Sequence, residues 1–431
     1  MGTSKKLCSC VFGLSFFLWS FFPPPLMGQE DLRALREEIH KMREESERQR
    51  QQVKALEEKL QRMEAQSEQK AKELEEKVAK QTSSWVDRYL KTQTGDTRYS
   101  LTGYAFGDYR WRSKRGNQNE RMNTFGAGFN PIFLYRLNDW IFFEGELEVE
   151  LEGTDTEVAL EYAQANLFLN DYMTLGVGKY LTPFGEFIER IHPAWIHKLI
   201  TRPLPYRSTG AGGFLRFSEV GAQLRGVVPL GNPHGTEAEY AVFVGNGPRF
   251  RTADRGSDLL NNFEDNNIGK SWGGRLGLRP LPFDWEMGRL KLGVSTYNGK
   301  WRGDRWLNIW GLDWAYQHDP FELRGEYLGF RREMFAGVNT DKRGGWYLQG
   351  AYKLSAVPIR YIDRSEVILR YSALHQPQHP TREFVANPRQ FTLGWDFWLT
   401  PSVVWKLEFG RDFPRGDKKG NQFLTQFALG F

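Results

Sequence analysis

The segment 140–152 alternates between apolar and acidic residues, and this alternation constrains the fold more than any other feature of the chain. Apolar residues occupy the odd positions, and glutamates occupy the even positions from 144 to 152. Because successive side chains of a strand point to opposite faces, this strand needs an apolar surrounding on one side and water on the other. A soluble sandwich accommodates one such strand at an edge. Many of them indicate a barrel with a lipid-facing exterior and an aqueous lumen.

Strand-like segments recur sixteen times after residue 98. They lie near 99–112, 121–136, 140–152, 156–169, 172–180, 215–229, 237–246, 270–280, 288–297, 306–317, 321–331, 344–354, 365–375, 388–399, 403–411 and 422–431. Short turns such as 138–139 alternate with long connections such as 376–387. An even strand number with this asymmetry is typical of bacterial outer-membrane barrels. The sequence therefore predicts an all-β transmembrane barrel of about 16 antiparallel strands over 99–431.

Composition agrees with this class and excludes several others. Aromatic residues make up 15% of the chain, there are 44 glycines, and the mean hydropathy is −0.57, which excludes a helical membrane protein. The two cysteines, Cys8 and Cys10, precede the barrel and leave it without a disulfide framework or an attached haem. A net charge of +5 is small for this length and gives no reason to expect a nucleic-acid partner.

The first 28 residues are predicted to be a signal peptide. A basic pair, Lys5 and Lys6, precedes an apolar stretch over 7–22, and three prolines follow at 23–25. Such a stretch is short for a membrane-spanning helix and suits an exported precursor. A retained anchor helix is the open alternative.

Residues 30–91 are predicted to form an α-helical coiled coil in the periplasm. With Leu32 at position a, nine of the thirteen a and d positions are apolar through Leu74, and opposite charges flank them. A single helix cannot bury this seam, so the segment implies self-association, as a dimer or a trimer. A solitary, solvated helix is the alternative.

The C-terminal strand ends in a pattern typical of outer-membrane barrel proteins. Phe427, Leu429 and Phe431 share one face, and Phe431 is the last residue. We interpret these three residues as an assembly signal. Together with the leader, they predict the outer membrane of a Gram-negative-type bacterium, with outer-membrane lipid as a partner.

A constriction loop is predicted over about 181–214. It is too apolar to lie in water, and connections of this length are usually functional. Two short helices are expected, at Glu186–Ile191 and Ala194–Leu199. The residues expected to form the pore constriction are Lys179, Pro183, Phe184, Gly185, Arg190, Lys198, Arg202 and Arg207.

The segment Gly178-Lys179-Tyr180-Leu181-Thr182-Pro183-Phe184-Gly185 resembles the phosphate-selective porin O and P family, in which a Gly-Lys/Arg-x-x-x-Pro-Phe-Gly segment follows an aligned hairpin. The strand number, the terminal Phe and the N-terminal coiled coil agree with relatives. The resemblance implies a homotrimeric porin, anion-selective in some members through basic lumen residues. This chain lacks a dense ladder of Lys and Arg, so that selectivity does not follow automatically.

Charges of both signs are expected on the lumen faces of the strands. The carboxylates and guanidinium groups that we expect to face the lumen are Glu144, Glu146, Glu148, Glu150, Arg225, Arg275, Arg279, Arg324 and Arg370. Opposed ladders would create a field that orients polar solutes; the alternative is that these charges pair and fill the lumen. Basic residues outnumber acidic ones in the loop, which favours anions there, including phosphate-like anions.

The sequence therefore predicts a porin for passive diffusion of small hydrophilic solutes or ions. No catalytic or phosphate-binding motif occurs, so we expect no enzyme activity and no cofactor, with a barrel-embedded hydrolase left open. His192 and His197 lack the carboxylate spacing of a metal site, and no metal is expected. A structural alternative is a barrel that anchors a periplasmic coiled-coil tether; another is a barrel that sheathes a redox partner.

Overall fold

The structure is a computed structural model. It describes scattered residues between 33 and 69, and then 98–113, 122–152, 155–207, 218–231, 235–250, 257–258, 268–281, 287–334, 340–375, 387–413 and 420–431. The chain divides into two units, Met1–Arg88 and Tyr89–Phe431. Among the described residues, no helix is long and apolar enough to cross a membrane.

The first unit is described only in part. Its described residues are helical, and His40 Nδ1 lies 3.5 Å from Glu44 Oε1, one helical turn later. The predicted signal peptide (1–28) and most of the predicted coiled coil (30–91) lie outside the described residues.

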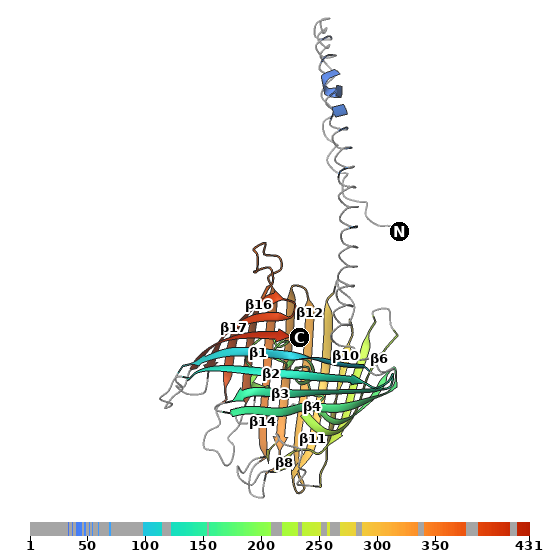
Figure 1. Ribbon diagram of the computed structural model, residues 1–431, viewed down its shortest axis with the longest axis vertical. Coiled ribbons are helices and arrows are strands. Elements are labelled where there is room, and N and C mark those ends of the chain that lie inside the picture. The colour runs from blue at the N-terminus through green and yellow to red at the C-terminus, as the bar shows by residue number, and fades with distance from the viewer. Residues whose placement is uncertain are drawn as a thin grey trace, which may run out of the picture. The chain divides into compact units, whose positions relative to one another are not determined.

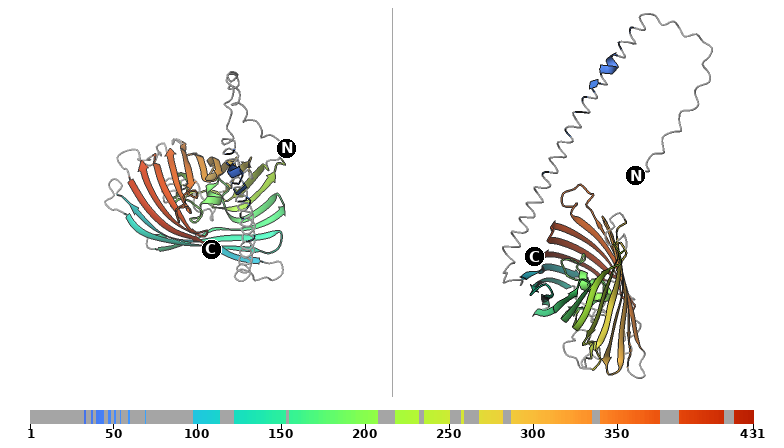
Figure 2. Two further views of the ribbon diagram at one scale, coloured as in Figure 1. Left: turned by 90° about the horizontal axis from the view of Figure 1, so that it is seen from above. Right: turned by 90° about the vertical axis from the view of Figure 1, so that its right-hand side faces the viewer.

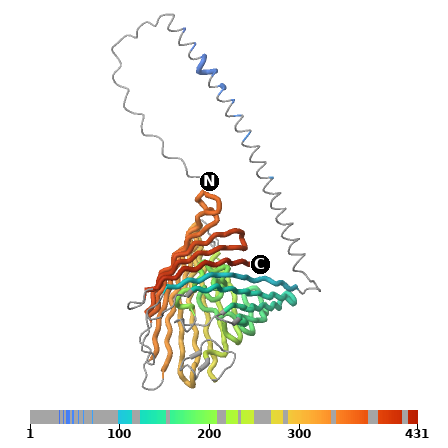
Figure 3. The backbone as a smooth tube through the Cα atoms, turned by 60° about the vertical axis from the view of Figure 1, so that its left-hand side comes forward, coloured from blue at the N-terminus to red at the C-terminus, as the bar shows by residue number. Residues whose placement is uncertain are grey.

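The second unit is a closed barrel of sixteen antiparallel strands, in which each strand pairs with its neighbours in the chain and β1 pairs with β18 (Figures 1 and 3). Its strands are β1 (Arg98–Arg112), β2 (Met122–Arg136), β3 (Ile141–Glu152), β4 (Asp155–Asn170), β5 (Met173–Leu181), β6 (Ser218–Pro229), β7 (Glu237–Gly245), β10 (Ser271–Arg279), β11 (Arg289–Arg302), β12 (Arg305–His318), β13 (Phe321–Arg332), β14 (Asp341–Lys353), β15 (Ser365–His375), β16 (Arg389–Thr400), β17 (Val403–Phe413) and β18 (Gly420–Gly430). A separate pair, β8 (Arg249–Phe250) and β9 (Ser257–Asp258), lies in the connection after β7.

The predicted strand number and antiparallel order are confirmed, and one strand end differs clearly from the prediction. Strand β11 was expected to end near 297 and continues to Arg302. Asn298, Gly299 and Lys300 have the composition of a loop, but they pair with β12 as far as Trp306. The two-residue turn at 303–304 closes a long hairpin there.

The two faces of the barrel wall differ in polarity as a membrane barrel requires. Outward-facing residues such as Leu276 and Val244 are large, apolar and exposed, whereas Arg275 on the opposite face of β10 is buried. Polar residues inside and apolar residues outside reverse the arrangement of a soluble protein and suit a barrel surrounded by lipid.

The C-terminal strand follows the same alternation. Phe427 and Phe431 are exposed on the outer face, with Leu429 between them, and the ring of Phe431 stacks on Phe129 of β2 at 5.7 Å. The backbone N–H of Phe431 donates to Gly103 O, so the last residue is held against β1.

Candidate functional site in the barrel lumen

The connection after β5 turns into the barrel. Seen from above in Figure 2, this green segment lies within the ring of strands. Its apolar side chains pack against lumen-facing residues of β11, β12, β13 and β14. The buried cluster includes Phe184, Phe187, Ile188, Ile191, Leu204, Tyr206, Tyr297, Ile309, Leu328 and Tyr347. Burial of these apolar groups holds residues 182–207 against one wall of the lumen.

The loop begins at Pro183, Phe184 and Gly185, where the backbone passes close to β13. Gly185 has φ +66°, and its N–H donates to Ser295 Oγ at 3.0 Å. A Cβ at this position would collide with the Glu326 carboxylate and lie 2.6 Å from the Tyr206 hydroxyl oxygen. The left-handed conformation and the close approach both require glycine here.

Glu326 on β13 is the acceptor that fixes this part of the loop. Its carboxylate accepts a hydrogen bond from the Phe187 N–H at 2.9 Å and another from the Tyr347 hydroxyl at 2.8 Å. The Tyr206 hydroxyl, from the far end of the loop, also donates to it. One buried side chain therefore ties both ends of the loop to the wall.

One of the two expected short helices forms and the other does not. Phe187–Ile191 is a single helical turn of the wide, π type. The prediction of a helix at Ala194–Leu199 was wrong, because the chain makes a turn in which the Ile196 and His197 N–H groups both donate to Pro193 O. The carbonyl that an α-helix would have used at Ala194 accepts instead from Lys406 of β17. A short 3₁₀ turn follows at Leu204–Tyr206.

Charged side chains fasten the second half of the loop to β13, β15 and β17. Lys198 Nζ lies 2.5 Å from Glu366 and 3.3 Å from Glu322. Thr201 donates to Glu408 from both its N–H, at 2.9 Å, and its hydroxyl, at 2.6 Å. Arg324 also binds Glu322.

Arg370 and Arg207 bind uncharged partners at the same part of the loop. Arg370 of β15 is buried and donates to the Thr201 hydroxyl at 2.8 Å. Arg207 donates to the side-chain oxygen of Gln390 at 2.5 Å. These two predicted site residues therefore hold the loop in place.

Arg190 and Arg275 share one carboxylate at the first turn of the loop. Arg190 binds Glu186 and Glu239, each at 2.8 Å, and Arg275 binds Glu239 at 2.6 Å and Asp313 at 2.5 Å. Arg279 also contacts Glu239, at 2.9 Å. The cations predicted for this region are thus brought together, but each is neutralised by at least one carboxylate.

Sequence reasoning missed Glu239 and Asp313, the acidic partners of these cations, and Glu408, which accepts from Thr201. Their position on the lumen-facing side of β7, β12 and β17 is the signal that could have identified them.

Lys179 also differs from its predicted setting: it is buried and donates to Leu160 O of β4, so it fastens β5 to its neighbour.

The acidic residues of β3 face the loop across the lumen. Glu144 accepts from Gln164 at 2.5 Å and from Asn166 at 2.9 Å, and Arg225 lies 3.4 Å away. Glu146 is buried. Further along, the Arg202 guanidinium of the loop is 3.9 Å from Glu148, and these two side chains are 42% and 24% exposed.

Glu150 is the neighbour of Glu148 on the same face of β3, two positions further along the strand. Glu144, Glu146, Glu148 and Glu150 therefore form an acidic wall on the lumen face of β3, which meets the loop at the pair Glu148 and Arg202.

The two loop histidines are buried, and neither resembles a metal ligand. Burial, reinforced by the positive charge of Arg202, lowers the pKa of His192 to about 3. Burial also lowers the pKa of His197 well below its usual value, with Arg370 as the next cause. Both rings are therefore neutral near pH 7. Within the described part of the chain, no group of three or more His, Cys, Asp or Glu side chains could hold a metal ion.

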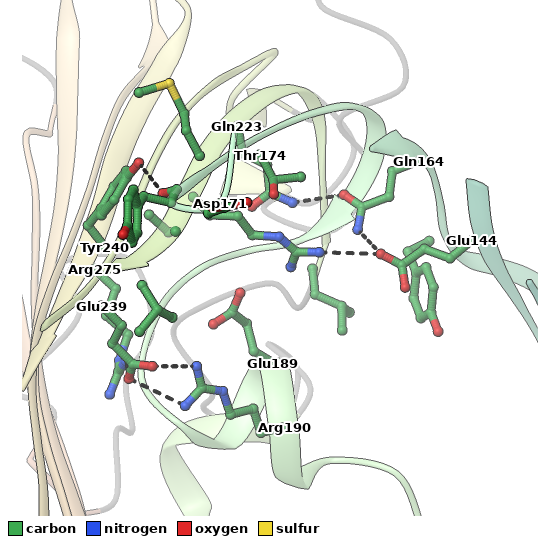
Figure 4. Close-up of a pocket in the computed structure, with 18 residues that line it drawn as sticks. Glu144, Gln164, Asp171, Thr174, Glu189, Arg190, Gln223, Glu239, Tyr240 and Arg275 are labelled. Carbon is green, nitrogen blue, oxygen red and sulfur yellow. Dashed lines mark hydrogen bonds and ion pairs between the residues drawn. The ribbon is translucent and has the colours of Figure 1, made fainter. Parts of the chain in front are cut away.

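A cavity of about 520 Å³ lies beside the first turn of the loop, next to the 171–172 turn (Figure 4). Charged groups of both signs line it, with aromatic and amide side chains between them. They include Glu144, Glu189, Arg190, Arg225, Glu239 and Arg275, together with Tyr172, Gln164 and Tyr240.

Solved structures with a similar fold are outer-membrane channels. The chain superposes on OmpF of Salmonella typhi with a TM-score of 0.53 and 12% identity, covering 78% of this chain and 98% of that one. The anion-selective porin of Comamonas acidovorans gives 0.51 and 13%, covering 78% and 100%. The outer-membrane channel DcaP of Acinetobacter baumannii gives 0.50 and 12%, covering 79% and 99%. No model of a protein family matches the chain, and no curated protein matches it either. The fold is thus that of the outer-membrane porins.

Proposed function

We propose that the chain is an outer-membrane porin through which small hydrophilic solutes and ions diffuse passively, without catalysis and without a cofactor. The observation that carries this proposal is the position of residues 182–207. The loop packs against the wall formed by β11–β17 and approaches β3 at the pair Arg202 and Glu148, which stay partly exposed. The aqueous path then runs along the acidic wall of β3 beside this pair, and the loop sets its width.

The path has opposite charges on its two sides. Arg202 on the loop faces Glu148 on β3. A transverse field of this kind orients dipolar solutes as they pass. The predicted preference for anions, phosphate-like ones included, stays a prediction. The described anion-selective neighbour supports it, whereas the carboxylates that neutralise Arg190 and Lys198 weaken it.

We further propose membership in the phosphate-selective porin O and P family, with a homotrimer in the outer membrane. The support is the segment 178–185, in which the geometry at Gly185 explains why the motif ends in glycine. The signal peptide at 1–28, the periplasmic coiled coil at 30–91 and the assembly role of Phe427, Leu429 and Phe431 belong to the same proposal.

The test is conductance of the folded protein in a planar bilayer with a KCl gradient. We expect stable channels that insert in steps of three, and a reversal potential that moves toward anion preference when Glu148 is replaced by Gln. Deletion of 30–91 separates the porin from a tether, because a porin that still assembles keeps its conductance. A folded, heat-modifiable barrel that never conducts would contradict the porin and favour the tether.

A further inference from the structure

The cavity in Figure 4 contains a carboxylate without a direct partner. Glu189 projects into it from the first turn of the loop. Among the described residues, its carboxylate makes no hydrogen bond and no ion pair, and no dashed line reaches it in Figure 4. Burial raises the pKa of Glu189, as expected for an acid that lacks a contacting cation.

The cations nearest to Glu189 are engaged elsewhere. Arg190, its neighbour in the chain, binds Glu186 and Glu239. Arg275 binds Glu239 and Asp313. Both guanidinium groups lower the pKa of Glu189 from a distance, but their hydrogen bonds go to other carboxylates. Glu189 therefore has acceptor capacity that the described residues leave unused.

Arg225 on β6 is the complementary group in the same cavity. Its side chain is 37% exposed, and its ion pair with Glu144 is a single contact of 3.4 Å from Nη2. A guanidinium group has five N–H donors, so most of its donors face the cavity or solvent. Arg225 is close enough for its charge to act on Glu189, but the two side chains form no ion pair.

A separated pair of opposite charges in one cavity suits a solute that bridges them. We propose that this cavity binds small zwitterionic solutes, such as amino acids and short peptides, with the ammonium group at Glu189 and the carboxylate at Arg225. This inference rests on the proposed channel function. It names the class of solute that the cavity binds while the solute passes through the channel.

The rest of the lining agrees with such a solute. The volume of about 520 Å³ lies in the range of small-molecule sites. Tyr162 and Leu181, on the lumen side of β4 and β5, provide apolar surface for a short side chain. Gln164 and Gln223 are bound to Glu144 and to each other, and among the described residues the side-chain oxygen of Gln223 has no donor, so it can accept from a peptide N–H. A solute with one charge alone would satisfy Glu189 or Arg225 and leave the other as it is.

The test compares three peptides that differ in charge. L-alanyl-L-alanine carries both charges, its N-acetyl derivative lacks the ammonium, and its C-terminal amide lacks the carboxylate. Binding is measured by interruption of the KCl current in bilayers, and by saturation-transfer NMR on the detergent-solubilised protein, which needs no conductance. We expect the zwitterion to bind at least about tenfold more tightly than either derivative, because each lost contact is a charge-assisted hydrogen bond.

Variants assign each contact to a residue. Glu189→Gln should abolish the preference for the zwitterion over the N-acetyl derivative, and Arg225→Gln should abolish the preference over the amide. Glu237→Gln is the matched control, since Glu237 lies on β7 outside the cavity and pairs with Arg279; it should keep both preferences.

The two proposals fail in different ways. A folded barrel without KCl conductance contradicts the porin, while the NMR comparison still decides whether the cavity binds zwitterions. A conducting wild-type channel that treats the three peptides alike overturns the binding site and leaves the porin intact. Preferences that survive in Glu189→Gln and Arg225→Gln overturn it as well.

Discussion

Replacing Gly185 by alanine should release the loop from the wall without unfolding the barrel. The backbone at Gly185 has φ +66°, and an added Cβ would collide with the Glu326 carboxylate. A left-handed conformation costs a residue other than glycine roughly 1–2 kcal/mol, and overpacking of a buried site costs about 1–3 kcal/mol. Together these two costs weaken the packing of the loop against the barrel wall by about 2–5 kcal/mol. Since 1.4 kcal/mol is a factor of ten, the state in which the loop has left the wall becomes at least about 25-fold more populated.

Two measurements follow this change. Single-channel conductance should rise, because residues 182–207 no longer narrow the lumen. Trypsin should cleave the loop faster, because Arg190 and Lys198 lose the carboxylates that now hold them. The barrel itself should keep its heat-modifiable migration, since the sixteen-strand ladder is untouched.

Two glycine controls separate strain from collision. Gly303 has φ +53° in the turn between β11 and β12, and Gly107 lies in strand β1; an added Cβ meets no atom within 4 Å at either position. Gly303→Ala therefore carries the conformational cost alone, and Gly107→Ala carries neither cost. The reasoning is refuted if Gly185→Ala keeps wild-type conductance and protease resistance, or changes them no more than Gly303→Ala does.

Three further predictions concern the loop and the C-terminus. Lys406→Met removes the ammonium that donates to two loop carbonyls, so we expect a loss of about 1.5–3 kcal/mol for each hydrogen bond, measured as a lower unfolding temperature of the folded barrel in detergent. His192 and His197 are neutral in the folded loop because burial lowers the pKa of both, whereas the unfolded chain binds a proton at each below about pH 6.5. The loop should lose about 1.4 kcal/mol per pH unit at His192 as the pH falls from 6.5 toward 3, and it should lose stability in the same direction at His197. We expect more frequent high-conductance openings at pH 4.5, which a double His→Gln variant reduces. Phe431→Ala removes the ring stacked on Phe129 and should reduce the amount of assembled barrel in outer-membrane fractions, while Phe423→Ala, further from the terminus, should reduce it less.

The barrel could be predicted from the sequence because its signal is local. The alternation in 140–152 gives the strand, its faces and the position of the acidic wall without knowledge of any other segment. The apolar residues of 182–207 likewise indicate that the loop cannot lie in water. The end of strand β11 was harder to predict from the sequence. Asn298 and Gly299 have a loop-like composition and become part of a strand only through pairing with β12.

The partners of the lumen charges could not be predicted, because they depend on register between distant segments. Arg190 meets Glu239 across 49 positions of the chain, and Lys198 meets Glu366 across 168. Nothing near either residue in the sequence indicates these contacts. The turn at Ala194 was missed for the same reason, since its carbonyl is bound by Lys406.

These pairings change which charges govern passage. A count of basic residues in the loop favours anions, but Arg190 and Lys198 are bound to carboxylates and act mainly as fasteners. A paired charge exerts little net field on an ion that passes at a distance, whereas a partly exposed one faces it directly. Selectivity should therefore depend on Arg202, Arg225 and Glu148, whose side chains stay 42%, 37% and 24% exposed. Exchanging Arg202 for Gln should shift the reversal potential more than the same exchange at Lys198, even though both remove one positive charge from the same loop.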